Sequence, residues 1–256
     1  MGSASFWAVW AYDFAFDAGR YVVAAVAAFL VFWVWKRERF RRRLVNREFA
    51  SGRHIRREIA YSASTALVFS LVGTGIVFGT RAGVFHVYTR VASHGWAYLV
   101  LSVAALLALQ DTYFYWTHRA MHHRWLFGWM HLAHHRSHNP SPFAAYAFSP
   151  AEALVHAGFV PLMLLWLPLH TFALFAFLAV MILRNVLGHL GIELFPRGFA
   201  RGRLTRWSTT TTHHALHHRR SSTNFGLYST VWDRLMGTTD PAYEATFEEV
   251  ASRKTT

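Results

Sequence analysis

Residues 96–122 read WAYLVLSVAALLALQDTYFYWTHRAMH, an apolar run that ends in two histidines. The run from Trp96 to about Trp116 is close to the length that a helix needs to cross a bilayer core. His118 and His122 follow it directly, and their i,i+4 spacing places both imidazoles on one helical face. The stretch therefore predicts a membrane-spanning helix that carries two candidate metal ligands at one membrane surface.

The rest of the chain has the composition of a membrane protein. Of its 256 residues, 54% are hydrophobic and 17% are aromatic, which is high for a soluble globule. Three more apolar segments run from Tyr21 to Trp35, from Ile59 to Phe78 and from Ala153 to Leu187. The first of them reaches spanning length only if part of the preceding stretch from Phe6 to Phe16, or its interfacial tryptophans, contributes to it.

The last apolar segment is interrupted at Leu167-Pro168-Leu169-His170, where a proline would break a helix. We predict that two short helices form a hairpin at this position. The fold class expected from the sequence is thus an all-α membrane protein. It has about three full spanning helices, the hairpin and a cytoplasmic His-rich metal-binding region.

A strongly basic loop predicts how the chain is oriented. Between Lys36 and Arg57 there are ten lysines or arginines against two acids, as is typical of a cytoplasmic loop beside a span. After this loop the chain is expected to cross the membrane outward and back before Trp116, and the hairpin enters and leaves by one face. The segments 118–138 and 213–218 should therefore lie on the cytoplasmic side, like the loop. The formal charge of +13 would suggest nucleic acid in a soluble protein, but here the charge lies beside apolar spans. The N-terminal apolar run ends in this cluster rather than in a small-residue cleavage site, so we expect a retained anchor.

Histidine has to carry any metal chemistry, because the chain has no cysteine. Eleven of the 17 histidines fall in two windows, seven between His118 and His138 and four between His213 and His218. The pattern H-x-x-H-H occurs twice, at residues 131–135 and 214–218. With the first pair, these eight histidines exceed the ligands that one zinc ion uses, which predicts two metal ions. Imidazole suits iron, zinc, copper and nickel, so the ligand type alone does not select the metal.

This arrangement resembles the fatty acid hydroxylase and sterol desaturase family over roughly residues 110 to 240. Similar stretches are His134-His135-Arg136-Ser137 with Asn139-Pro140, Gly188-His189-Leu190-Gly191 with Glu193, and Asn224-Phe225-Gly226 leading to Trp232-Asp233-Arg234-Leu235-Met236-Gly237-Thr238. The resemblance implies a centre of two iron ions (Fe2+/Fe3+), activation of O2, and attack on an unactivated C–H bond of a lipid. Carried over by position, the metal ligands are His118, His122, His131, His134, His135, His189, His214, His217 and His218.

Three polar residues are expected to support these ligands. Asp111 lies two turns before His118 and could accept the second ring N–H of a ligating histidine. Asn185 lies four residues before His189 and could orient that ring or hold a metal-bound water. Glu193 could tune the site through hydrogen bonds.

The sequence departs from the family pattern at Ser149, where many relatives carry a histidine immediately before the proline. A serine cannot replace an imidazole ligand. Either that histidine is not a ligand in the family, or His138, His156 or His213 compensates for it in this chain.

Three regions are expected along the chain. These are a membrane anchor region with the basic loop (1–95), a catalytic domain (96–240) and a C-terminal tail (241–256). No flavin or nicotinamide fingerprint is visible, so electrons are expected from a separate donor protein, with a lipid as substrate and no nucleic-acid partner. The use of arginine over lysine and the compact length favour a bacterial inner membrane, although an endoplasmic-reticulum protein could look the same.

Two other functions are compatible with a histidine-rich membrane protein. A metal-binding or transport protein would carry histidines inside several spans. A zinc-dependent membrane hydrolase would need a carboxylate base beside an open coordination position, and the zinc-protease pattern H-E-x-x-H is absent.

Overall fold

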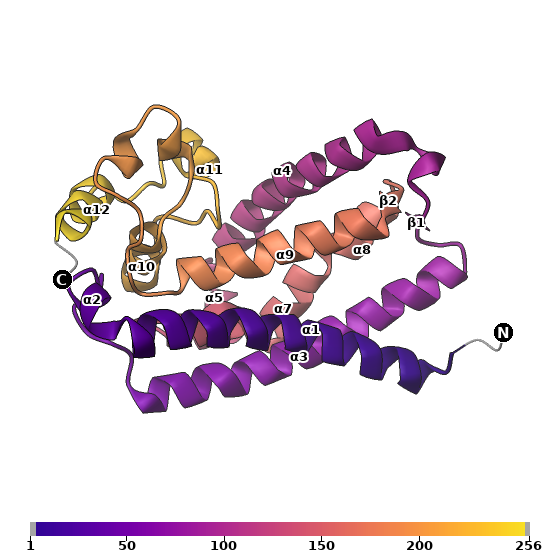
Figure 1. The fold of residues 1–256 in the computed structure, drawn as a ribbon, viewed down its shortest axis with the longest axis horizontal. Helices are drawn as coiled ribbons and strands as arrows, with labels where there is room; N and C mark the ends of the chain where they lie inside the picture. Colours follow the sequence, from indigo (N-terminus) through magenta and orange to yellow (C-terminus); the bar gives the residue numbers. More distant parts are fainter. Residues whose placement is uncertain (1–3, 254–256) are drawn as a thin grey trace.

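In the described part of the chain, four helices that are long and apolar enough to cross a membrane form the body of the protein (Figure 1). The computed structural model describes residues 4–253. The four helices are α1 (Phe6–Ala28), which continues as the π-helix η1 (Phe29–Trp35), α3 (Gly52–Arg81), α4 (Gly95–Met121) and α9 (Thr171–Gly188). This architecture confirms the predicted all-α membrane fold.

The apolar segments of the sequence lie inside helices that extend beyond them. The first helix begins at Phe6 and runs without a break to Trp35, and the side chain of the preceding Ser5 caps it by accepting a hydrogen bond from the Ala8 N–H. The stretch from Phe6 to Phe16 therefore supplies the missing length, as the prediction required. In the same way Ser51 caps α3, and α4 continues through His118 to Met121.

The predicted hairpin is present, and its second arm is a full helix. The first arm consists of α7 (Pro150–Ala157) and α8 (Phe159–Leu164), and the second arm is α9. At the tip, β2 (Leu169–His170) pairs in parallel with β1 (Val87–Tyr88), in the loop between α3 and α4. The hairpin therefore spans the bundle from the histidine-rich end to the opposite end (Figure 1).

Short elements cover the histidine-rich end of the bundle, and one more lies at the other end beside β1 and β2. The former are α2 (Arg37–Arg41), α5 (Phe127–Met130), α6 (Leu132–His135), η3 (Pro142–Tyr146), η4 (Phe199–Arg201), η5 (Thr205–Trp207), α10 (Thr211–Arg220), α11 (Val231–Leu235) and α12 (Tyr243–Ser252). The 3-10 turn η2 (Val91–Ser93) precedes α4 at the other end.

The basic loop lies at the same end of the bundle as the histidine segments. Leu44 forms an isolated antiparallel bridge with Ile192, three residues after His189. The predicted C-terminal tail also belongs to this end, because α12 buries Tyr243 and Phe247 against α10. The loop and the tail are therefore packed parts of the domain that holds the histidines.

Candidate metal centre

Nine histidine rings converge beside α10. Among residues 4–253 they form two groups, and within each group one ring nitrogen per residue lies within 4.8 Å of the others. The first group contains His118, His122, His131, His135 and His217. The second group contains His134, His189, His214 and His218. The structure thus brings together all nine histidines that the sequence put forward as ligands.

Each H-x-x-H-H triplet contributes to both groups. His131 and His135 belong to the first group, whereas His134 belongs to the second. In the triplet at 214–218, His214 and His218 belong to the second group and only His217 belongs to the first. Residues four apart share a helical face, and the third histidine is turned away from that pair. One helical turn can therefore serve two neighbouring metal ions.

Main-chain carbonyls orient three of the nine rings. The Nδ1–H of His118 donates to Phe225 O (2.7 Å), that of His217 to Thr223 O (2.7 Å) and that of His189 to Asn185 O (2.8 Å). Because a carbonyl oxygen only accepts, the ring proton must lie on Nδ1, which leaves a lone pair on Nε2. This is the form of histidine that binds a metal ion.

The Nε2 atoms face one another across each group. His118 Nε2 lies 2.9 Å from His131 Nε2, and His189 Nε2 lies 2.9 Å from His214 Nε2. Since the protons of His118 and His189 lie on Nδ1, their Nε2 lone pairs point at the facing rings, where they can bind a metal ion or accept a hydrogen bond. The donor set therefore fits metal ions, and imidazole donors suit iron among others.

Burial keeps these rings in the neutral state that metal binding requires. It lowers the pKa of His135 and of His189 to about 4. The pKa of His122 falls to about 2, mainly through burial and also through the neighbouring rings of His118 and His135. A proton therefore competes weakly with a metal ion at these nitrogens near neutral pH.

Glu152 is a supporting residue that the sequence interpretation missed. Its Oε1 accepts a hydrogen bond from His131 Nδ1 at 2.7 Å, and both side chains are 1% exposed. Glu152 is positioned by the start of α7, where Ser149 Oγ accepts from the Glu152 N–H (3.2 Å) and donates to Met130 O (2.5 Å). Ser149, which stands in place of the family histidine, thus fixes a carboxylate behind a candidate ligand.

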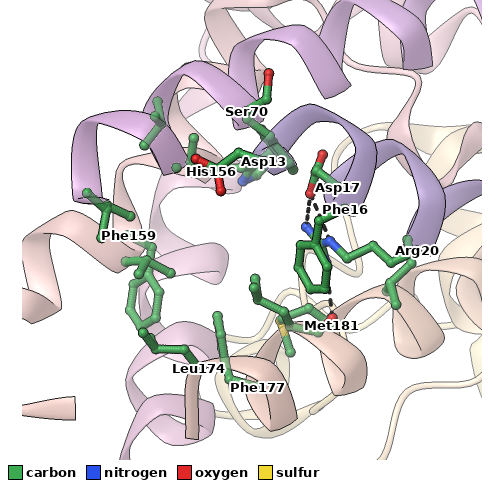
Figure 2. Close-up of a pocket in the computed structure, with 18 of the residues that line it drawn as sticks. Asp13, Phe16, Asp17, Arg20, Ser70, His156, Phe159, Leu174, Phe177 and Met181 are labelled. Atoms are coloured by element: carbon green, nitrogen blue, oxygen red, sulfur yellow. Dashed lines mark hydrogen bonds and ion pairs between the residues drawn. The ribbon is translucent and has the colours of Figure 1, made fainter. Parts of the chain in front are cut away.

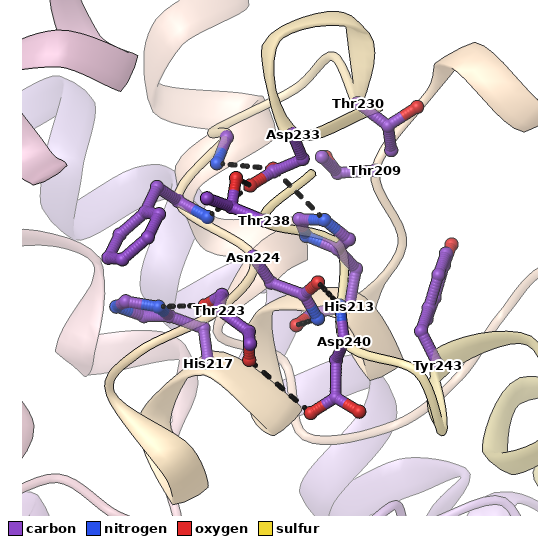
Figure 3. A network of polar contacts seen from close by, with 12 residues as sticks. Thr209, His213, His217, Thr223, Asn224, Thr230, Asp233, Thr238, Asp240 and Tyr243 are labelled. Carbon is purple, nitrogen blue, oxygen red and sulfur yellow. Dashed lines mark hydrogen bonds and ion pairs between the residues drawn. The ribbon is translucent and has the colours of Figure 1, made fainter. Parts of the chain in front are cut away.

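A buried network holds the loop 223–226, whose carbonyls orient two of the rings (Figure 3). Asp233 Oδ1 accepts from the Phe225 N–H and Oδ2 accepts from the Gly226 N–H, both at 2.8 Å. The His213 Nε2 lies 3.3 Å from the same carboxylate. This network explains why the motif leading from the loop to Asp233 belongs to the site, although it contains no ligand.

Asp111 does not have the role expected for it. The second ring nitrogen of His118 is bonded to the carbonyl of Phe225, so the position predicted for the aspartate is taken. Asp111 is buried, and its Oδ1 has no hydrogen-bond partner among the residues that the structure describes. A carbonyl from a distant loop could not be foreseen from the spacing within one helix.

Asn185 and Glu193 act on the backbone around the site. Asn185 orients His189 through its main-chain carbonyl, while its side chain donates to Ala145 O at 2.6 Å. Glu193 is buried and accepts from both the main-chain N–H (2.9 Å) and the hydroxyl (2.8 Å) of Thr212. It therefore fixes the first turn of α10, which carries three of the nine histidines.

The three histidines considered as substitutes at Ser149 lie outside both groups of described residues. The ring of His138 contacts that of His54 (4.9 Å between centroids), the ring of His156 stacks on Phe114 (5.2 Å), and His213 faces Asp233.

An apolar cavity of about 360 Å³ adjoins the two groups, between α1, α3, α4, α8 and α9 (Figure 2). Phe114 and Phe148 line this cavity and also contact the histidines. The ring centroids are 4.9 Å apart for Phe114 and His118, and 5.2 Å apart for Phe148 and His134. The two phenyl rings therefore separate the cavity from one member of each group.

Comparison with known proteins connects this geometry to one family. The family model described as fatty acid hydroxylase matches residues 103–238. Lathosterol oxidase of Rattus norvegicus is 28% identical over 191 residues, which cover 72% of this chain and 60% of that protein. Delta(7)-sterol 5(6)-desaturase ERG3B of Gibberella zeae is 28% identical over 222 residues, covering 80% and 64%. Very-long-chain aldehyde decarbonylase GL1-1 of Oryza sativa subsp. indica is 36% identical over 148 residues, covering 55% and 24%.

The chain spans about 60% of the length of the lathosterol oxidases that it matches. No solved structure shows a significant match.

Proposed function

Since the chain belongs to the fatty acid hydroxylase family, we propose that it is a membrane oxidoreductase that uses O2 and two iron ions to hydroxylate or desaturate a lipid. Its membrane is proposed to be a bacterial inner membrane, with the histidines at the cytoplasmic face. The proposed ligands are the nine histidines of the two groups, five for one ion and four for the other. Bound iron would supply the activation of O2 and the attack on a C–H bond.

One observation carries the proposal, namely that two aromatic residues of the apolar cavity's wall are in ring contact with candidate ligands. The lining of the cavity is predominantly apolar, which suits the hydrocarbon part of a lipid. Phe114 and Phe148 stand between the cavity and the candidate ligands. A lipid in the cavity would place a carbon at this wall, where the two aromatic rings exclude water and limit which carbon approaches.

The protein's own groups then hold the ligands and their protons in place. Glu152 keeps a proton on His131 Nδ1 and offsets part of the positive charge of the metal ions. In the loop 223–226, the carbonyl oxygens of Phe225 and Thr223 likewise keep a proton on Nδ1 of two more candidate ligands, His118 and His217. Electrons are proposed to come from a separate donor protein at the face that carries the basic loop.

The geometry gives less support to the two other functions. A transport protein would need histidines along several spans, whereas the nine rings gather at one end of the bundle. A hydrolase would need a carboxylate base, but Glu152 is bonded to the Nδ1 side of a candidate ligand, away from the convergent Nε2 atoms.

Lipid extracts of cells that express the wild type or His134→Ala test the proposal. The wild type should yield a lipid changed by one oxygen or by two hydrogens, and His134→Ala should not. His138→Ala is the matched control, since His138 lies outside both groups, and it should retain the product. Identical lipids in all three strains, or one zinc ion per chain with activity that needs no O2, would reject the proposed reaction.

A further inference from the structure

The cavity has a polar site of its own, far along the chain from the histidines. It is built on α1, outside the residues 103–238 that the family model matches. Asp13, Asp17 and Arg20 line the cavity there, and Phe159, Leu174 and Phe177 lie across from Asp17 and Arg20 (Figure 2). Charged side chains inside an apolar bundle are costly, so this cluster calls for a functional explanation.

The two carboxylate oxygens of Asp17 differ in their hydrogen bonding. The Arg20 Nε (2.8 Å), the Arg20 Nη2 and the Tyr146 hydroxyl (3.3 Å) all donate to Oδ1. Oδ2 is buried and has no hydrogen-bond partner among residues 4–253, and the residue is only 7% exposed. A buried carboxylate oxygen without a donor is unfavourable by itself, and a donor from a bound molecule would satisfy it.

The other polar groups that line the cavity also favour a ligand group that donates a hydrogen bond. Gln110 Oε1 is a second buried acceptor that has no partner in the described part of the chain. The guanidinium of Arg20 is already engaged by Asp17 and by the Leu178 carbonyl (3.1 Å), and the two aspartates outnumber it. A carboxylate or phosphate group would therefore meet acceptors and excess negative charge, whereas a hydroxyl would supply the missing donor.

We propose that Asp17 binds the hydroxyl of a neutral, hydroxyl-bearing lipid, whose apolar body then extends along the cavity toward Phe114 and Phe148. The inference rests on the proposed function in that this lipid is the substrate. Asp17 is accordingly a specificity-determining residue supplied by a helix outside the matched family region. It discriminates against free fatty acids and against lipids without a donor at this end.

Binding of matched probes to the metal-loaded full chain in detergent tests the proposal without O2 or reductant. The probes are 1-octadecanol, its methyl ether and octadecanoate, together with cholesterol and its methyl ether, and the measurement is the ligand-induced shift in melting temperature over a concentration series. With at least one skeleton, the alcohol should bind about tenfold more tightly than the ether, since only the alcohol donates a hydrogen bond. Octadecanoate should bind more weakly than octadecanol.

Asp17→Asn should abolish the preference for the alcohol over the ether, because an amide N–H replaces the acceptor. Asp13→Asn is the matched control: it changes the charge of the cavity equally, but Asp13 Oδ2 already accepts from Thr74 (3.0 Å), so the preference should persist. The alcohol and the ether are compared on the same variant, so a change in the melting temperature of the ligand-free protein does not alter the measured preference.

A wild type without any preference, or an Asp17→Asn protein that keeps it, would overturn the assignment. The iron content of the same samples is measured separately. An alcohol preference in a protein that binds no iron would reject the proposed chemistry and leave the lipid site standing.

Discussion

At the scale of single residues, the charge of Glu152 is expected to strengthen metal binding through His131. Glu152→Gln retains the shape of the side chain but removes the negative charge behind the ring. We expect the affinity of the first group for metal to fall by about tenfold, as is common when a carboxylate behind a ligating histidine is changed. Metal retained by the purified protein against a graded chelator series measures this effect.

Glu249→Gln is the control for this change, because Glu249 pairs with Arg47 and Arg253 on the surface. It should retain metal like the wild type. Equal retention by Glu152→Gln and the wild type would mean that the hydrogen bond to His131 has no influence on the site.

The lowered pKa values of the buried rings predict how the metal-free protein responds to acid. His135 and His189 have pKa values of about 4 when folded and an ordinary value of 6.5 when unfolded. The unfolded chain thus binds more protons below pH 6.5, so their contribution to stability is complete above that pH and is lost as the pH falls toward 4. Each ring contributes a slope of about 1.4 kcal/mol per pH unit within this window.

The melting temperature of metal-free protein between pH 7.5 and 5 measures this response. It should fall with pH, and the fall should be shallower in His189→Phe, which has one titrating ring fewer. A melting temperature that is constant over this range would contradict the prediction.

Sequence reasoning at the residue scale recovered the ligand candidates but not the groups behind them. The histidines were visible because their spacing repeats within single helical turns. Glu152 was hidden because Ser149-Pro-Ala-Glu152 has the pattern of an ordinary capping box, in which the glutamate serves its own helix. Only the packing of α7 beside His131 turns the carboxylate toward the ring, and that contact joins residues 21 positions apart.

At the scale of elements, the loop 223–226 is expected to tolerate no side chain at Gly226. A Cβ atom there would lie 2.2 Å from the Ser229 carbonyl oxygen and 2.9 Å from Asp233 Oδ2. Gly226→Ala should therefore shift the loop and destabilise the protein by about 1–3 kcal/mol. Thermal unfolding together with metal content measures both consequences.

Gly128→Ala in α5 is the matched substitution, since a Cβ atom there meets nothing within 4 Å. It should change stability by no more than about 0.5 kcal/mol. If the two variants behave alike, the loop is not held as tightly as its contacts indicate.

The long helices could be predicted from the sequence because apolar runs near spanning length have few alternatives in a membrane. The short elements at the histidine-rich end could not. The triplet at 131–135 straddles the junction of α5 and α6, whereas the triplet at 214–218 lies within one continuous helix. Identical motifs thus adopt different local structures, and contacts with the rest of the fold decide which one forms.

At the scale of the whole molecule, the chain is expected to have the basic loop and the histidine segments on one side of the membrane. Because it contains no cysteine, a single introduced thiol reports its own location without background labelling. Ser51 and Ser222 are exposed at the histidine-rich end, and Ser93 is exposed at the opposite end. The three changes Ser51→Cys, Ser222→Cys and Ser93→Cys therefore form a matched set.

In intact cells, a membrane-impermeant maleimide should label only Ser93→Cys, because the basic loop is expected to face the cytoplasm. After permeabilisation all three variants should react. Labelling of Ser51→Cys and Ser222→Cys from opposite sides would contradict the arrangement in which the hairpin enters and leaves through one face. Labelling of these two variants together in intact cells would preserve that arrangement but reverse the orientation, and the proposed electron donor would then have to act from the outer side.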